Sequence, residues 1–485
     1  MSSSDEVITV QRTASTSSLS LHVTPSVKHR IGQLILYFVK IFFPSMVFVK
    51  FFVSAIIPPI ADNIIPLYFT GNIPNESSLA VASQFTFISI ILEVIQEGVG
   101  NSLFHFVGNH YRNNKELALV AFKLSLLILL VGGILLTIAM LIFTPQFVNL
   151  INTPESIIED TKHFLYTSSF SFTPILLRTA FTNYLLISTS TYLVVTQVLT
   201  VLIAFFVNFF MFGEQSFSLK WGVHELGYYK IVQSFLAMTV SFVFVLVVEK
   251  MGPVSFLFKI PFFQNLKTNF KAFFRVSWGN FADSMVRNFF YFVVTLNFLN
   301  NLGADEAAAW SVLNTIIWGI ILVPGNVVAN YVKVEIGLDS VKSKIKRIAK
   351  ESTISLAAWI VLMTILTATL WPLLASFFSK ANQNVAKLSL TMLYNVGWIF
   401  IIFAINNTID SFFLGTGKTE YVFYQSFLTN MIVYFVPWIL YLAGILTPSY
   451  WWVLGLFIAG MLVDFCLTCY FCVIVWRGMP THEMI

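Results

Sequence analysis

The sequence predicts an all-α membrane protein with twelve transmembrane helices. Of its 485 residues, 57% are hydrophobic and only 11% are charged. The mean hydropathy of +0.80 is far above that of a soluble chain with a solvated surface. The apolar residues form long continuous runs, whereas the strands of a membrane barrel would give short alternating segments. These observations favour a helical bundle in lipid.

Each apolar run is long enough to cross a bilayer as a helix. A hydrocarbon core of about 30 Å requires roughly 20 apolar residues. The predicted spans are 44–70, 78–107, 122–144, 163–187, 192–213, 228–248, 276–299, 306–332, 353–378, 387–414, 421–444 and 450–476.

Lys and Arg residues are concentrated in loops on one side of the predicted bundle. Segments 250–275 and 342–350 are the richest in them, whereas the opposite loops hold little beyond Lys162, Lys220, Lys380 and Lys387. The positive-inside rule therefore places both termini in the cytoplasm. We expect a multi-pass protein of the plasma membrane, and the opposite side would carry the glycosylation sequon at Asn75.

The segment before the first span has a different composition. Residues 1–30 are rich in Ser and Thr and lack the apolar core of a signal peptide, so they predict a disordered cytoplasmic tail. Residues 31–43 are expected to form an interfacial helix. Three cysteines, Cys466, Cys469 and Cys472, lie in the last span, where small apolar fillers are more plausible than a metal site.

The two halves of the chain repeat one another. A shift of 225 residues pairs Gly100 and Asn101 with Gly325 and Asn326, and a shift of 228 pairs "STSTYLVVTQ" with "TGKTEYVFYQ". Six spans per half is an even number, so the halves are related by an axis along the membrane normal. We predict six-helix bundles at 31–250 and 276–478, a basic cytoplasmic linker at 251–275, and a cleft between the bundles.

Three motifs resemble those of the multidrug and toxic compound extrusion (MATE) transporters. They are "EGVGNSLFHFVGNHYRNNKELA" after the second span, "LINTPESIIEDTKHFLY" before the fourth, and "FFLGTGKTEYVFYQ" after the tenth. The resemblance extends over about residues 40–478. Arg112 and Leu414 depart from it, because the family more often has Gly and Arg at these positions.

The resemblance implies a secondary active exporter of amphipathic organic compounds, coupled to H⁺ or Na⁺, with alternating access of the two halves. No phosphate-binding loop or nucleic-acid-binding charge stripe appears in the sequence. His105 and His110 lack metal-ligand partners at helical spacing, so we expect no enzyme activity, cofactor or metal. A flippase for lipids or lipid-linked saccharides is the alternative. The expected partners are a small organic substrate and membrane lipid, with the protein acting as a monomer.

Asp62 is the first candidate for ion coupling. It lies in "AIIPPIADNIIPLYFTG", where a carboxylate within a span is costly unless protonated, paired or hydrated. Pro58 and Pro59 predict a helix break beside it. "IADNI" also matches the first-span position at which prokaryotic MATE transporters carry an aspartate implicated in coupling. The alternative is that Asp62 lies in water at the outer mouth. Asn208 of the fifth span, near a family Asn/Asp position, is expected to hydrogen-bond Asp62.

Glu93 and Glu97 of the second span form a further coupling candidate. They are four residues apart, so they share one helix face. Two close carboxylates favour binding of one proton or one Na⁺. The alternative is a structural pairing with a basic residue of a neighbouring span, such as Arg178.

Polar residues of the second half are candidates for the substrate cleft. Asp283 and Arg287 are four residues apart in the seventh span, which is also the spacing of a self-satisfied ion pair. If Arg287 faces the cleft, it favours an anionic or zwitterionic substrate. Asn406 and Asp410 lie in the tenth span, and Asp410 is expected to be solvated near the cytoplasmic end. Asp464 in the last span is expected to make a helix–helix hydrogen bond.

Overall fold

The computed structural model describes most of the chain between residues 41 and 479. The described residues are 41–43, 45–71, 73, 81–82, 85–111, 113–150, 157–188, 191–258, 266–296, 298, 302, 306, 309–310, 313–314, 316–338, 341–378 and 383–479. The predicted tail at 1–30, most of the interfacial segment 31–43, the sequon at Asn75 and part of the predicted linker lie outside them.

The described part of the chain is helical and contains no strand, which confirms the all-α class. The first half comprises α2 Met46–Pro59, η1 Ile60–Ile64, α3 Ile65–Gly71, α5 Phe85–Tyr111, α6 Lys115–Leu150, α7 Ile158–Ser168, η3 Ser169–Ser171, α8 Phe172–Ile187, α9 Tyr192–Phe212, η4 Val223–Glu225 and α10 Leu226–Glu249. Helix α11 Pro253–Phe258 lies in the predicted linker, where Phe256 contacts Phe122 and Phe242 of the first half. The second half comprises α12 Leu266–Phe290, η5 Tyr291–Leu296, η6 Ile317–Ile321, α15 Val323–Leu338, α16 Lys342–Phe378, α17 Gln383–Val396, α18 Ile399–Thr416, α19 Thr419–Thr429, η7 Asn430–Phe435, α20 Val436–Leu442 and α21 Tyr450–Gly478.

Seven of the described helices are individually long and apolar enough to cross a membrane. The other predicted spans correspond to shorter or interrupted helices, such as the series α2, η1 and α3. Several spans begin earlier than expected, among them α6, which starts at Lys115, and α16, which starts at Lys342. Their charged first turns are helical because Lys, Arg and Glu are good helix formers. The charges lower the hydropathy of these turns, so each apolar run begins later in the sequence than its helix.

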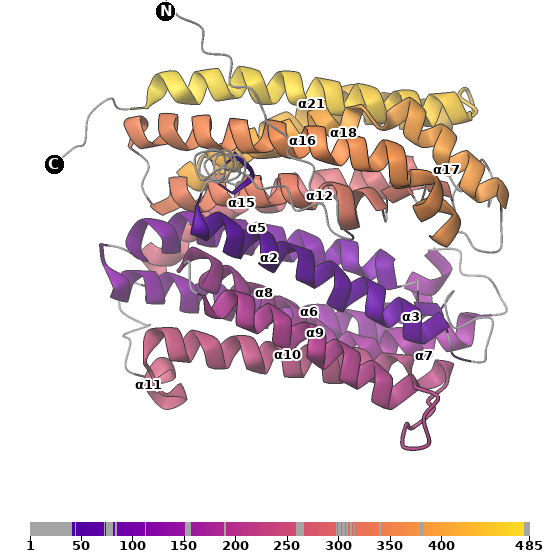
Figure 1. The fold of residues 1–485 in the computed structure, drawn as a ribbon, viewed down its shortest axis with the longest axis horizontal. Coiled ribbons are helices and arrows are strands. Elements are labelled where there is room, and N and C mark those ends of the chain that lie inside the picture. The colour runs from indigo at the N-terminus through magenta and orange to yellow at the C-terminus, as the bar shows by residue number, and fades with distance from the viewer. Residues whose placement is uncertain are drawn as a thin grey trace, which may run out of the picture.

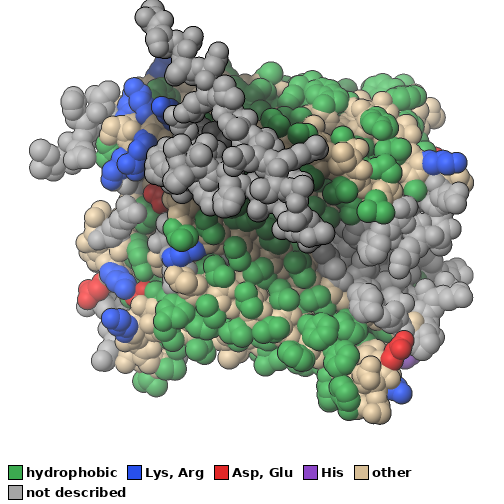
Figure 2. Space-filling model, viewed as in Figure 1, with side chains coloured by type: hydrophobic (Ala, Val, Ile, Leu, Met, Phe, Trp, Pro, Cys, Tyr) green, Lys and Arg blue, Asp and Glu red, His purple; other side chains and the backbone are tan. Residues whose placement is uncertain are grey.

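The helices form two groups, one from each half of the chain. Figure 1 shows the helices up to α10 on one side and α12 to α21 on the other, with most axes roughly parallel. Helix α5 packs against α12 and α15 where the groups meet. In the face drawn in Figure 2, hydrophobic side chains predominate on the described surface away from the two ends, and most of the visible charged groups lie toward the ends. This is the surface expected of a protein that lies in a bilayer.

The first span of each half contains a widened, π-helical turn. In the first half it is η1, which follows Pro58 and Pro59 and includes Asp62. In the second half it is η5, which follows α12. The predicted break at the prolines is therefore a π-turn within a continuous helix rather than an interruption. Such turns are frequent at functional sites, and their matching positions agree with the internal repeat.

The two halves meet backbone to backbone at one end of α5 and α15. A Cβ atom on Gly108 would lie 3.0 Å from the carbonyl carbon and oxygen of Gly337, and one on Gly337 would lie 2.5 Å from the carbonyl oxygen of Phe104. Only glycine allows this approach. Nearby, the His105 ring lies against Gly417, which has a φ of +73°. At this end, which is predicted to be cytoplasmic, the two halves are therefore in close contact.

Candidate functional site

A polar cavity of about 470 Å³ lies between the two halves. Helix α5 contributes a stripe of residues at helical spacing, and α8 and α15 provide the remaining walls. The lining residues are Ser89, Glu93, Gln96, Glu97, Gly100, Asn101 and Phe104 from α5, Thr179, Asn183 and Leu186 from α8, and Asn330 and Lys333 from α15. A cleft between the halves was predicted from the repeat, and this cavity occupies that position.

An ion pair at the cavity joins the two halves. The guanidinium Nη2 of Arg287 on α12 contacts Oε2 of Glu97 on α5, and it lies 3.8 Å from Oδ2 of Asp283. The expected pairing of Asp283 with Arg287 is therefore present, but Arg287 also reaches across to the other half. Glu97 is thus paired with a basic residue of another span, as the structural alternative predicted, but the partner is Arg287 rather than Arg178, which binds Asp62.

Arg287 is surrounded by more carboxylates than it can neutralise. Besides Glu97 and Asp283, it interacts electrostatically with Glu93 and Asp464. No hydrogen bond or ion pair joins Glu93 to another described residue, and its side chain is solvent-accessible in the cavity. The Arg287 guanidinium thus interacts with a cluster of four acidic groups, which extends from the cavity into the second half.

Asp62 is bound by Arg178 within the first half. Arg178 donates two hydrogen bonds to the Asp62 carboxylate, of 3.1 Å from Nη1 and 2.6 Å from Nη2. The expected hydrogen bond between Asn208 and Asp62 is not present. The Asn208 amide instead donates to Ala204 O at 2.8 Å and to Gln233 Oε1 at 3.1 Å. The planar guanidinium matches both carboxylate oxygens and leaves the amide to other partners.

Gln233 connects Asn208 indirectly to the π-turn. Its Nε2 donates to the carbonyl oxygen of Ala61 at 3.3 Å. Asn208 therefore supports the backbone next to Asp62 rather than its carboxylate.

Asp410 lies in a hydrogen-bonded network, so its predicted solvation was wrong. Gln425 Nε2 donates to Asp410 Oδ1 at 2.6 Å, and Asn406 Nδ2 donates to Asp410 Oδ2 at 3.3 Å. The same Asn406 nitrogen donates to Asp464 Oδ2 at 2.7 Å. The Asp464 bond is the helix–helix hydrogen bond that was expected. Asp410 is held inside the bundle because α18, α19 and α21 surround it with amide and hydroxyl donors.

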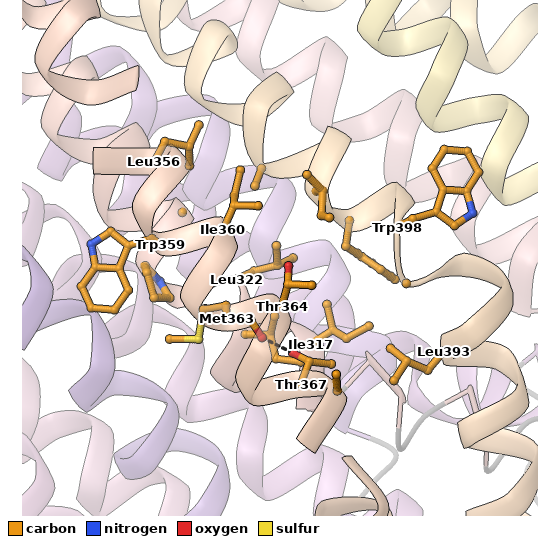
Figure 3. A pocket seen from close by; sticks show the side chains of 18 of the residues that line it. Ile317, Leu322, Leu356, Trp359, Ile360, Met363, Thr364, Thr367, Leu393 and Trp398 are labelled. Carbon is orange, nitrogen blue, oxygen red and sulfur yellow. Dashed lines mark hydrogen bonds between the residues drawn. The ribbon is translucent and has the colours of Figure 1, made fainter. Parts of the chain in front are cut away.

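A second cavity, of about 280 Å³, is apolar and lies within the second half. Figure 3 shows its walls, which include Trp359, Met363, Leu393 and Trp398. One of its hydroxyl groups is engaged locally, by the 2.6 Å hydrogen bond from Thr367 Oγ1 to Met363 O. The lining is mostly apolar and does not include the residues of the ion pair between the halves.

The residues in the described part of the chain include no cluster of three His, Cys, Asp or Glu that would hold a metal ion. The cysteines Cys466, Cys469 and Cys472 are free.

Sequence reasoning missed Lys333 and Asn330, which line the cavity from α15. Lys333 Nζ donates to Asn101 Oδ1 at 3.1 Å and lies 4.8 Å from the centre of the Phe104 ring. The sequence could have indicated Lys333, because a lysine near the end of an apolar span is costly unless it faces water or a partner.

Comparison with known proteins agrees with this architecture. Residues 282–440 match the family model MatE. A MOP superfamily transporter from Pyrococcus furiosus, with a binding pocket described as of reverse polarity, superposes with a TM-score of 0.73 at 13% identity, covering 89% of this chain and 96% of that one. A mutant of the Vibrio cholerae MATE transporter VcmN gives a TM-score of 0.68 at 14% identity, with the same coverage.

An outward-facing multidrug resistance MATE family transporter also shares the fold. It superposes with a TM-score of 0.73 at 12% identity, covering 89% of this chain and 96% of that chain. No curated protein matches the sequence. The matched proteins have twelve transmembrane helices in two halves, which confirms the predicted architecture.

Proposed function

We propose that the chain is a membrane transporter of the MATE family and that it exports amphipathic organic compounds in exchange for protons. Transport then proceeds by rocking of the two six-helix halves around the cavity between them. Family membership also supports a transporter rather than an enzyme.

One observation carries the coupling proposal, namely the four carboxylates around Arg287. The Glu97 carboxylate is in the first half and the Arg287 guanidinium is in the second, so their ion pair holds the halves in one relative position. Protonation of Glu97 removes its charge and weakens this contact. A ligand shifts a conformational equilibrium through its different affinity for the two states, and the proton has that property here.

The structure favours Glu97 over Asp62 as the coupling carboxylate. Both oxygens of Asp62 are bound by Arg178 of the same half, so protonation of Asp62 weakens a contact within one half rather than one between the halves. Asp62 and Asn208 are proposed to stabilise the π-turn of the first span, through Arg178 and Gln233.

The proton is the coupling ion that best fits this site. A Na⁺ ion at Glu97 would need several oxygen ligands in the space that the Arg287 guanidinium occupies. A proton needs no coordination shell and adds directly to the carboxylate.

We predict that Asp62→Asn retains proton coupling while it destabilises the fold. The variant keeps the side-chain volume but leaves the Arg178 guanidinium without its carboxylate in a partly buried position. Pairs of this kind contribute to stability chiefly through the cost of leaving one partner alone. The thermal unfolding midpoint of the purified variant should fall, with the pH dependence of transport unchanged. Loss of the pH dependence would return the coupling role to Asp62.

The flippase alternative fits the cavity less well. A lipid-linked pyrophosphate requires several unneutralised cations, whereas Lys333 is the one basic residue among the described lining and the adjacent Arg287 is paired with carboxylates. The cavity therefore lacks the cationic surface that a diphosphate group needs.

Transport by purified protein in sealed proteoliposomes tests the proposed function. We expect a radiolabelled organic solute to move against its gradient when a pH difference is imposed, and to stop when an ionophore removes it. Replacing Na⁺ with K⁺ at fixed pH should change nothing. Transport that persists without the pH difference but requires Na⁺ would overturn proton coupling, and flipping of a fluorescent lipid without solute transport would favour the alternative.

The remaining assignments are proposals about the protein in its membrane. We propose that it acts as a monomer in the plasma membrane with both termini in the cytoplasm. Epitope tags on the termini should resist protease in sealed cells, and their digestion from outside would reject this topology.

A further inference from the structure

We infer that the substrate of the cavity is an elongated zwitterion, with its cationic group at Glu93 and its anionic group at Lys333. The inference rests on the proposed transport function, and it specifies the charge and shape of the compound carried. It follows from the positions of the charges that line the cavity.

The two halves present opposite charges to the same cavity. Glu93 lies on α5 of the first half and Lys333 on α15 of the second. Neither is in an ion pair with another described residue. Lys333 donates to the neutral amide of Asn101, and its electrostatic partner Glu97 is already paired with Arg287.

Glu97 is the other charged residue in the described lining of the cavity. Glu97 and Arg287 form the ion pair across the halves. With that pair neutral, the lining presents one carboxylate and one ammonium group to a ligand. A substrate with one charge of each sign and no net charge is the complement of this surface.

The two charges are far enough apart to select an elongated compound. Lys333 Nζ lies 3.1 Å from Asn101 Oδ1, at the level of residue 101 on α5. Glu93 is eight residues earlier on the same helix, which corresponds to about 12 Å at 1.5 Å per residue. An α-amino acid is too short to reach both groups at once.

The surface between the charges suits a polar or amphipathic linker. The side chains of Gln96, Asn183, Asn330 and Thr179 provide both donors and acceptors, and Phe104 adds an apolar wall beside Lys333. A volume of about 470 Å³ lies in the usual range for small-molecule sites.

A zwitterion is preferred because a singly charged compound leaves one protein charge without a partner. A cation bound at Glu93 would displace water from Lys333 and leave its ammonium group without an anion. An anion bound at Lys333 would likewise leave the Glu93 carboxylate without a cation. Unpaired charge in a site is a source of specificity against the wrong ligand.

Binding of ω-aminooctanoate to the purified full-length protein tests this inference. Its amine and carboxylate are at opposite ends of an unbranched chain. The matched probes are its methyl ester, which is a cation, its N-acetyl derivative, which is an anion, and β-alanine, a short zwitterion. By calorimetric titration we expect ω-aminooctanoate to bind about tenfold tighter or more than each of the others, since each good charged contact contributes 1.4 kcal/mol or more.

Two variants identify the residues responsible. Lys333→Gln should abolish the preference of the zwitterion over the methyl ester, and Glu93→Gln should abolish its preference over the N-acetyl derivative. Lys333→Arg keeps the charge and should retain the wild-type order, which controls for folding.

The inference is overturned if the methyl ester binds as tightly as ω-aminooctanoate, if none of the probes binds, or if Lys333→Gln leaves the order unchanged. Because these measurements need no ion gradient, they are independent of proton coupling. Selective binding without pH-driven transport would support the site and reject the proposed coupling.

Discussion

Glu97→Gln is expected to abolish transport driven by a pH gradient, while leaving the protein folded and able to bind substrate. The amide keeps the size of the side chain and a hydrogen bond to Arg287, but it can neither take up a proton nor form the ion pair across the halves. Proteoliposomes loaded at different internal pH should show a loss of gradient-driven transport of about tenfold or more, which corresponds to a coupling free energy of the usual size.

Two further variants separate coupling from folding. Glu159→Gln removes a carboxylate whose ion pair with Lys162 lies at an exposed position, and it should transport like the wild type. The double variant Glu97→Arg, Arg287→Glu exchanges the two charges. It should restore the ion pair between the halves, but it places the positive charge on α5, the helix of Glu93, instead of on α12. Undiminished pH-driven transport by Glu97→Gln would contradict the coupling role of Glu97.

Gly337→Val is expected to block the transport cycle at the close contact between α5 and α15. The new Cβ would lie 2.5 Å from the Phe104 carbonyl oxygen, so α5 and α15 must separate by enough to admit it. Overpacking of this kind costs about 1–3 kcal/mol. A penalty of that size reduces the population of the packed conformation by about five- to 150-fold.

The matched control for this variant is Gly455→Val. Gly455 is also helical, on α21, but a Cβ there meets nothing within 4 Å. Gly455→Val should transport normally, whereas Gly337→Val should bind substrate and fail to complete the cycle. Normal transport by both variants would show that close contact of α5 with α15 is not required.

The sequence predicts the fold well because lipid imposes a simple rule on it. Backbone groups must be satisfied within each spanning segment, so long apolar runs are helices and their number defines the bundle. The lengths of helices with charged ends were underestimated, because hydropathy does not distinguish a charged helical turn, such as that at Lys342, from a loop.

The site was predicted only in part because side-chain partners depend on packing between helices. Glu93 and Glu97 are recognisable as a pair on one helix face, and Asp283 and Arg287 as another. That Arg287 reaches Glu97, and Arg178 reaches Asp62, depends on how distant spans are placed against each other. Helical spacing within one span contains no information on that placement.

The distance between the halves as a function of pH tests the central claim most directly. After replacement of the native cysteines by alanine, spin labels at Phe217→Cys and Ile445→Cys would report on exposed positions, one in each half. We predict that the distance distribution shifts between high and low pH in the otherwise unmodified protein, because protonation weakens the Glu97–Arg287 pair. In the Glu97→Gln background the low-pH distribution should persist at all pH values. A distribution that is independent of pH in the parent protein, or one that still responds to pH in Glu97→Gln, would contradict the account.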